Sequence, residues 1–255
     1  MRIIDNYQYQ AYNDIWREKL PNALSVFQFS ETEVGEEYQI QSSAVFSSNI
    51  EGNSIDLNSY MNSKLAKEKF KPTKELKEID DLVKAYFFAK NNSLTEKNFL
   101  YCHQLLSEEL LIKSLRGAYR NDKVGVFSPE GLVYLAVEEH LVVKEMSTLF
   151  SDIEELIKKD LSVVETFYYA SMIHLRLAHI HPFRDGNGRA ARLLEKWFLA
   201  QKLGVKFWQI PSEKYYKTHQ PQYYQNLNLG FDFYALDYER SLLFLNMLPN
   251  TLINN

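Results

Sequence analysis

The residues best suited to chemistry lie in one short segment that begins with a histidine. It reads His181-Pro182-Phe183-Arg184-Asp185-Gly186-Asn187-Gly188-Arg189, and Arg192 follows three positions later. Proline disfavours a helical conformation for the residue before it, so we expect a helix to end here and to hold His181 at the mouth of a loop. An imidazole in that place can act as a general base.

The second half of this segment has the features of an anion site. Gly186, Asn187 and Gly188 precede a run with helical apolar spacing, so their amides are expected to be free donors at a helix N-terminus. Arg189 and Arg192 project near each other from the first turn. Basic residues there oppose the helix dipole unless an anion is bound, which predicts a polyphosphate ligand.

Asp185 adds a hard oxygen ligand, and proteins usually hold Mg²⁺ with a single carboxylate together with substrate phosphates. Taken alone, each residue has a plainer interpretation, such as a surface histidine or a turn aspartate. Their occurrence within positions 181–192, in the order that phosphoryl chemistry requires, favours the functional interpretation. Phe183 is interpreted differently, as the apolar anchor that packs the loop on the core.

The segment resembles the motif of the Fic family, His-x-Phe-x-(Asp or Glu)-Gly-Asn-Gly-Arg-x-x-Arg, and fills every specified position. The resemblance extends over about residues 94–229. It implies a protein adenylyltransferase, in which His181 takes the proton from a Ser, Thr or Tyr hydroxyl of a target protein. That hydroxyl then attacks the α-phosphorus of ATP, and pyrophosphate leaves.

The resemblance also assigns the remaining residues of the segment. Asp185 is expected to hold Mg²⁺ between the α- and β-phosphates, and the amides of residues 186–188 with Asn187 are expected to line an anion hole. Arg189 and Arg192 are expected to clamp the outer phosphates. Dimers recur among similar proteins, so a homodimer and self-modification are among the expected interactions.

An upstream segment, Ser47-Ser48-Asn49-Ile50-Glu51-Gly52, resembles the family's inhibitory motif, (Ser or Thr)-x-x-x-Glu-(Gly or Asn). The resemblance implies that Glu51 pairs with Arg192 and obstructs the γ-phosphate. Catalysis would then be restrained by an N-terminal intramolecular helix that includes Ser47. The plainer interpretation is a helix end, with Glu51 in solvent and Gly52 as the C-terminal cap.

Three other activities fit parts of the same site. Glu51 could orient a water that removes AMP from a modified protein while His181 protonates the leaving hydroxyl. A relative that transfers phosphate carries lysine in place of the second glycine, so Gly188 counts against a kinase. A catalytically silent nucleotide-binding interaction module is the third alternative, and intact His181, Asp185 and Arg192 argue against it.

The elements that position these residues are predicted to be mostly helical. The 9 glycines and 7 prolines are few for 255 residues, which argues against an all-β fold. Apolar residues recur at helical spacing over 73–91, 142–157 and 167–178. Two hydroxyl–carboxylate pairs predict helix starts, Ser93 with Glu96 and Ser162 with Glu165. The polar segments 30–36 and 51–63 are interpreted as loops.

The exception is 123–137, where apolar residues alternate on both sides of Ser128-Pro129-Glu130-Gly131, a good turn sequence. This pattern predicts a β-hairpin, similar to the family's flap, on whose edge a target segment could dock as an added strand. The expected fold class is all-α with one small β-hairpin flap. The expected regions are an N-terminal helical region (1–93, with the inhibitory motif at 47–52), a core (94–229) and a C-terminal helix (230–255).

Composition excludes several classes of protein. The formal net charge of -4 gives no attraction for nucleic acid. No apolar run reaches the roughly 18 residues of a membrane span, and residues 1–12 lack the apolar centre of a secretory signal. A single cysteine, Cys102, cannot form an internal disulfide and is expected to be a packed bystander, so a cytoplasmic location is expected.

Histidines and tyrosines outside the motif admit two interpretations each. His174 and His179, with His181 and Asp185, could suggest a zinc cluster, but His174 lies on an apolar helical face and is better explained as a satisfied core histidine. Tyr223 and Tyr224 are candidates for the nucleotide site, near the base, although helical core packing explains them equally well.

Overall fold

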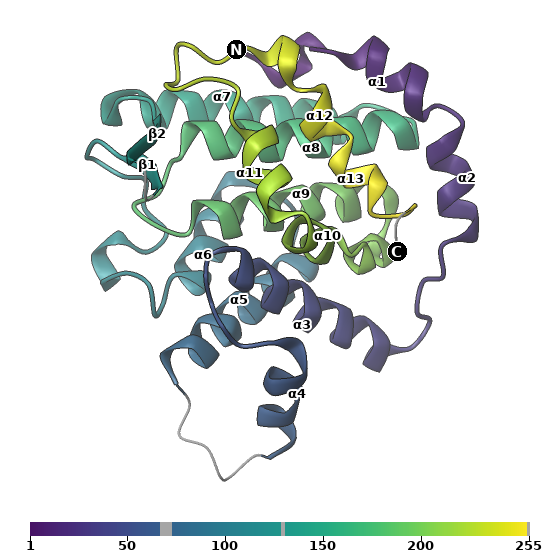
Figure 1. Cartoon of the computed structure of the whole chain (residues 1–255), viewed down its shortest axis with the longest axis vertical. Coiled ribbons are helices and arrows are strands. Elements are labelled where there is room, and N and C mark those ends of the chain that lie inside the picture. The colour runs from purple at the N-terminus through teal and green to yellow at the C-terminus, as the bar shows by residue number, and fades with distance from the viewer. Residues whose placement is uncertain (67–72, 129–130, 254–255) are drawn as a thin grey trace.

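Helices make up most of the computed structural model, which describes residues 1–66, 73–128 and 131–253 (Figure 1). The fold class is therefore as predicted, mostly α with a small hairpin. The α-helices are α1 (Tyr9–Trp16), α2 (Lys19–Val26), α3 (Glu33–Ile50), α4 (Leu57–Leu65), α5 (Lys74–Lys90), α6 (Glu96–Leu106), α7 (Glu139–Lys158), α8 (Val163–Ile180), α9 (Asn187–Leu203), α10 (Ser212–Thr218), α11 (Gln220–Leu227), α12 (Leu242–Leu245) and α13 (Met247–Asn250). The 3-10 helices are Ile3–Asp5, Lys113–Leu115, Val205–Gln209 and Tyr238–Arg240, and the strands are β1 (Gly125–Ser128) and β2 (Gly131–Leu135).

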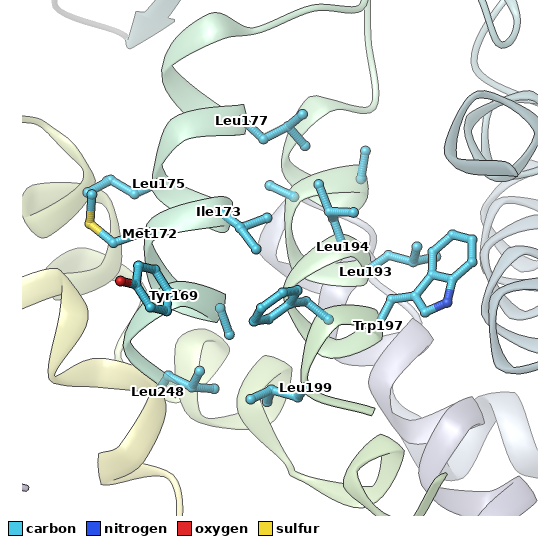
Figure 2. Packing of buried hydrophobic residues seen from close by; sticks show 14 of the residues in the cluster. Tyr169, Met172, Ile173, Leu175, Leu177, Leu193, Leu194, Trp197, Leu199 and Leu248 are labelled. Atoms are coloured by element: carbon cyan, nitrogen blue, oxygen red, sulfur yellow. The ribbon is translucent and has the colours of Figure 1, made fainter. Parts of the chain in front are cut away.

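The two central helices, α8 and α9, pack against each other and are joined by the segment 181–186. Figure 2 shows Ile173 of α8 and Leu194 of α9 pointing toward one another, while Leu175 points to the opposite side of α8. Most residues of both helices are buried, as expected of helices surrounded by other elements. The end of α8 and the start of α9 are thus fixed by the core.

The predicted start of α8 is confirmed, because Ser162 and Glu165 form a capping box. The Ser162 hydroxyl accepts from the Glu165 amide at 3.2 Å, and Glu165 accepts from the Ser162 amide at 2.8 Å. The predicted pair of Ser93 with Glu96 is wrong. Thr95 caps α6 instead, since its extended backbone places its hydroxyl to accept from the amide of Asn98 at 3.2 Å.

The helix expected over 73–91 is confirmed as α5, which Thr73 caps. The two segments expected to be loops are partly helical. Helix α3 begins at Glu33 after its N-cap Thr32, and α4 occupies Leu57–Leu65 after its N-cap Asp56. Capping residues are polar, so they made the first turns of these helices resemble loops.

The predicted hairpin is confirmed, with β1 and β2 antiparallel and Gly125 opposite Leu135. Pro129 and Glu130 of the expected turn lie outside the described residues. The end of β2 also pairs with the segment 231–233, because the Leu135 amide donates to Phe231 O at 2.9 Å and the Phe233 amide donates to Leu135 O at 3.1 Å.

The single C-terminal helix expected over 230–255 is wrong for the described residues to 253. The structure has a 3-10 turn and the short helices α12 and α13 there, and the segment before them is a turn in which Asp232 accepts from the amides of Tyr234 and Ala235. Pairing of 231–233 with the hairpin excludes a helix at that point. The limits of the three predicted regions stay a prediction.

Two sets of long-range contacts pack the N-terminal segments, those around Ile3 and α3, against later helices. The Ile3 amide donates to Asp152 of α7 at 2.8 Å, and α3 packs against α5, α9 and α10. This packing brings the end of α3 to the start of α9. Among the described helices, none is long and apolar enough to cross a membrane.

Candidate active site

His181 caps the C-terminal end of α8 and has a left-handed backbone, with φ 52°. This conformation is uncommon for a residue with a side chain and is held by the His181 amide, which donates to Leu177 O at 2.9 Å. Burial lowers the pKa of His181 to about 4, against a weaker opposing effect of its contact with Ala178 O at 3.4 Å. The imidazole is therefore neutral near pH 7 and can accept a proton.

Arg120 holds the backbone around His181, a role with no local signal in the sequence. Its side chain is buried and donates to His181 O at 2.8 Å and to Val137 O, at the end of the hairpin, at 2.5 Å. Its amide donates to Pro182 O at 2.9 Å. Arg120 thus joins the hairpin to the loop that carries the histidine.

Phe183 anchors the loop, as expected, and is fully buried. Its ring stacks on His103 of α6 with centroids 3.5 Å apart. His103 also contacts Asp185 O through Nε2 at 3.0 Å and accepts from the Gly117 amide through Nδ1 at 3.0 Å. Because Nδ1 is the acceptor, Nε2 carries the proton and donates to Asp185 O. His103, which the sequence pattern missed, therefore fixes the backbone at the predicted metal ligand.

The side-chain amide of Asn187 closes the loop by two hydrogen bonds with the backbone of Phe183. Its Oδ1 accepts from the Phe183 amide at 2.8 Å, and its Nδ2 donates to Phe183 O at 2.9 Å. Gly186 has φ 81°, a left-handed conformation that favours glycine, and α9 starts directly after it. The Asn187 side chain thus shapes the loop around the amides of Gly186 and Gly188.

Asp185 is the carboxylate that the geometry leaves available for a cation. Its side chain lies at the exposed mouth of the loop, and Oδ1 accepts from the Gly186 amide at 2.6 Å. Within the described residues, no cluster of three or more His, Cys, Asp or Glu could hold a metal by protein ligands alone. A single carboxylate fits Mg²⁺ bound mainly by substrate phosphates and does not fit a structural zinc site.

Arg192 is fully buried and has partners from two distant segments. It donates through Nε to Ser47 Oγ at 2.8 Å, and through Nη2 to Ser47 O at 2.9 Å and to Glu51 Oε1 at 2.7 Å. Arg189 is nearly as buried and lies 3.5 Å from a carboxylate oxygen of Glu78 on α5. Its Nε is a buried donor without a hydrogen-bond partner among the described residues. Both arginines therefore lie close enough to Glu51 for their charges to lower the pKa of its carboxyl.

Glu51 is the C-cap residue of α3 and lies against Gly188 in the first turn of α9. Its side chain is 30% exposed. Burial acts to raise its pKa, but the charge and hydrogen bond of Arg192, together with the charges of Arg189 and His181, lower it overall. A Cβ placed on Gly188 would lie 2.2 Å from Glu51 Oε1, so the carboxylate fills the space beside that glycine. Gly52, with φ 94°, follows as the cap. The helix thus ends here and Glu51 pairs with Arg192, while inhibition by Glu51 stays a prediction.

Tyr223 supports Arg192 from the other side. Its buried hydroxyl accepts from Arg192 Nη1 at 3.2 Å and lies 2.9 Å from His174 Nε2. His174 Nδ1 lies 2.8 Å from Glu195, so His174 is a satisfied core histidine, as expected. Tyr224 is 46% exposed, and its hydroxyl donates to Ile50 O at 3.0 Å. The two tyrosines thus contact the arginine and the end of α3.

His179 does not join a metal cluster either. Its Nδ1 lies 2.9 Å from the Tyr238 hydroxyl and its Nε2 lies 2.8 Å from Leu227 O. Burial lowers its pKa to about 3. Cys102 is buried and burial raises its pKa, which fits a packed thiol.

The sequence of the central part matches a known family. Residues 93–199 match the model of the Fic/DOC family. The protein adenylyltransferase Fic of Culex quinquefasciatus is 36% identical over 87 residues, which are 34% of this chain and 16% of that protein. The protein of the same name from Aedes aegypti is 42% identical over 62 residues, 24% of this chain and 11% of that protein. The chain therefore spans a small part of these relatives' length.

Two solved structures are similar over nearly the whole chain. A Fic family protein from Desulfovibrio desulfuricans has a TM-score of 0.74 at 22% identity, over 100% of this chain and 74% of that one. A Fic domain containing signaling protein from Bacteroides thetaiotaomicron has a TM-score of 0.66 at 20% identity, over 96% of this chain and 92% of that one. At these identities the similarity concerns the fold.

Proposed function

The chain belongs to the Fic family through its residues 93–199, and on that premise we propose that it is a protein adenylyltransferase. It transfers AMP from ATP to a Ser, Thr or Tyr hydroxyl of a target protein and releases pyrophosphate. The observation that carries the proposal is the neutral imidazole of His181 at one side of the loop and the arginine-lined N-terminus of α9 at the other. The names of the two mosquito relatives support the same reaction.

The site residues divide the work of the reaction. His181 accepts the proton of the target hydroxyl, whose oxygen forms a bond to the α-phosphorus as the bond to the pyrophosphate oxygen breaks. The amides of 186–188 and the guanidinium of Arg189 stabilise charge on the phosphate oxygens. Asp185 would hold Mg²⁺, which supplies charge neutralisation to the phosphates when bound. Tyr223 acts as a positioning residue, because its hydroxyl is already bonded to Arg192.

In the resting chain Glu51 restrains this reaction. Its carboxylate takes the guanidinium of Arg192, which an outer phosphate of ATP would otherwise bind. Carboxylate and phosphate compete for the same donors, so ATP binds productively only when Glu51 moves away. The close approach of Glu51 Oε1 to Gly188 supports this proposal, since it places the carboxylate at the N-terminus of α9, where an anion would bind.

The target protein is proposed to dock on the hairpin. Strand β2 is paired with β1 and with 231–233, so among the described residues β1 has the open edge. Phe127 on β1 is 72% exposed. A target segment can add to this edge by main-chain hydrogen bonds.

Phe127→Asp is expected to lower AMP transfer to a separate target at least fivefold and to leave ATP affinity unchanged. Equal AMP transfer by Phe127→Asp and by the unchanged chain would exclude the edge of β1 as the docking surface.

The reaction is tested with ATP labelled at the α- or the γ-phosphate in parallel. We expect Glu51→Gly to become labelled from α-labelled ATP only, at a level well above the unchanged chain. His181→Ala in the Glu51→Gly background is expected to lower labelling by about 10²-fold or more, because the general base is lost. Equal labelling of Glu51→Gly and the unchanged chain would contradict the restraint.

The same experiment separates the alternative activities. Label from γ-labelled ATP would indicate phosphate transfer. Label from neither nucleotide, even with Glu51→Gly, would favour a silent nucleotide-binding module. Loss of AMP from a previously modified protein, when the unchanged chain is added, would indicate that AMP removal is the resting activity.

A further inference from the structure

The C-terminal end of α3 is held by side chains from α10 and α11. Lys217 Nζ donates to Asn49 O at 2.9 Å, Gln220 Nε2 donates to Ile50 O at 2.7 Å, and the Tyr224 hydroxyl donates to the same oxygen at 3.0 Å. These are carbonyls of the last turn of α3, which lack the i→i+4 partner of inner turns, although Asn49 O also accepts from the Gly52 amide at 3.2 Å. We call Lys217, Gln220 and Tyr224 the α3 clamp.

The side chains of the α3 clamp are oriented by a hydrogen bond between them, and its positive charge suits the C-terminal end of a helix. Lys217 Nζ also donates to Gln220 Oε1 at 2.8 Å, which orients the amide group toward Ile50. An ammonium group at a helix C-terminus is favoured by the helix dipole. Glu51 follows Ile50 directly, so the clamp acts on the backbone next to the carboxylate that binds Arg192.

Helix α11 contacts Arg192 and Ile50, the residue that precedes Glu51. Tyr223 binds Arg192, and Tyr224, the next residue, binds Ile50 O. Helix α10 packs along α3, and Figure 1 shows α10 and α11 beside the end of α3 from which α4 continues. One pair of short helices therefore sets the position of the carboxylate relative to the guanidinium.

We propose that Lys217, Gln220 and Tyr224 are positioning residues that set the strength of the restraint by Glu51. The inference rests on the proposed AMP transfer and adds to it the residues that hold the inhibitory helix in place. When the clamp is broken, the Asn49 carbonyl loses its cationic partner Lys217 and the last turn of α3 frays. Glu51 then leaves Arg192 more often, and the arginine becomes available to ATP.

The test replaces Lys217 by Met, which removes the charge and keeps the aliphatic stem. Lys214→Met is the matched control, since Lys214 lies exposed on the same helix. We expect Lys217→Met to raise AMP transfer roughly tenfold in the chain with Glu51 and to cause no rise in the Glu51→Gly background. Lys217→Arg, which keeps a cation at the carbonyl, is expected to stay near the unchanged chain.

Hydrogen exchange supplies a readout that is independent of catalysis. The amides of residues 49–53 are expected to exchange faster in Lys217→Met than in Lys214→Met, with no difference in α8. The proposal is overturned if Glu51→Gly gains activity while Lys217→Met does not, or if Lys217→Met gains equally in both backgrounds. It is also overturned by unchanged exchange at 49–53.

Failure of the proposed function has a different signature. If Glu51→Gly transfers no AMP, binding of a non-hydrolysable ATP analogue replaces transfer as the readout. Affinity for the analogue is then expected to rise in the order of the unchanged chain, Lys217→Met and Glu51→Gly. Equal affinities of the unchanged chain and Lys217→Met would overturn the role of the clamp on this readout as well.

Discussion

At the scale of single residues, burial keeps the imidazoles around the loop neutral. It lowers the pKa of His103 and of His181 to about 4 and that of His179 to about 3. Neutrality serves a different purpose in each case. For His181 it leaves a nitrogen able to accept a proton. For His103 it preserves the hydrogen bond that Nδ1 accepts from the Gly117 amide, and for His179 it leaves Nδ1 able to accept from the Tyr238 hydroxyl, as an imidazolium could not.

The pKa of His103 predicts a loss of stability in acid. Its folded-state pKa of about 4 lies below the ordinary value of 6.5, so the unfolded chain binds more protons between these values. The free energy of unfolding therefore falls as the pH is lowered through this window. By pH 5 His103 alone is expected to cost roughly 2 kcal/mol relative to pH 7.5. Urea unfolding at the two pH values measures this.

A substitution isolates the contribution of that histidine. His103→Phe keeps a ring against Phe183 but cannot titrate, so its stability is expected to be lower at pH 7.5 and to fall less on acidification. His140→Gln, at an exposed position of α7, is the control and should keep the pH dependence of the unchanged chain. An unchanged slope in His103→Phe would contradict the assignment.

Local spacing indicates the site residues that lie close together along the chain, and the upstream motif adds Glu51. Asp185 and Arg192 follow His181 within one segment, and their spacing predicts their roles. Arg120 and His103 reach the loop from other segments, 61 and 82 residues away from the atoms that they bond. Neither stands in a pattern of its own, so only the packing of α6, α8 and the hairpin could place them.

At the scale of elements, the start of α6 provides a test of capping. The hydroxyl of Thr95 accepts from the Asn98 amide, whereas that of Ser93 has no such role. Thr95→Ala is expected to lower the free energy of unfolding by about 1 kcal/mol, and Ser93→Ala by less than about 0.5 kcal/mol. Chemical denaturation of the two variants measures the difference. A larger effect at Ser93 would show that the capping box with Glu96 forms in solution.

Helices that have one polar face were predictable, and the other elements were less so. The charged residues of α5 alternate with its buried ones, which gives a clear period and correct ends at Thr73 and Asn91. The C-terminal segment has an apolar run over 242–248 but forms only short helices there, and its residues 231–233 pair with β2 instead of forming a helix. That pairing is a tertiary contact, which local spacing cannot reveal.

At the scale of the whole molecule, the ion pair between Glu51 and Arg192 joins residues that are 141 positions apart. The motif at 47–52 indicated the pair, but only the packing of α3 on α5, α9 and α10 makes it. Arg192 is fully buried and Glu51 is 30% exposed, so the carboxylate is the partner with room to move. Glu51 therefore lies as an internal anion against Arg192, where the proposed function places an outer phosphate of ATP.

This arrangement predicts opposite effects of Glu51→Gly on stability with and without nucleotide. Without ligand the variant is expected to have a lower Tm, because buried Arg192 loses a charged partner. With Mg²⁺ and a non-hydrolysable ATP analogue it should gain more in Tm than the unchanged chain, since a ligand at a hundredfold excess over its Kd stabilises by about 2.7 kcal/mol. Thermal unfolding with and without EDTA measures both gains. In Glu51→Gly with Asp185→Ala the gain should no longer depend on Mg²⁺, because the predicted ligand is absent. Equal gains for Glu51→Gly and the unchanged chain would mean that Glu51 and the nucleotide do not compete.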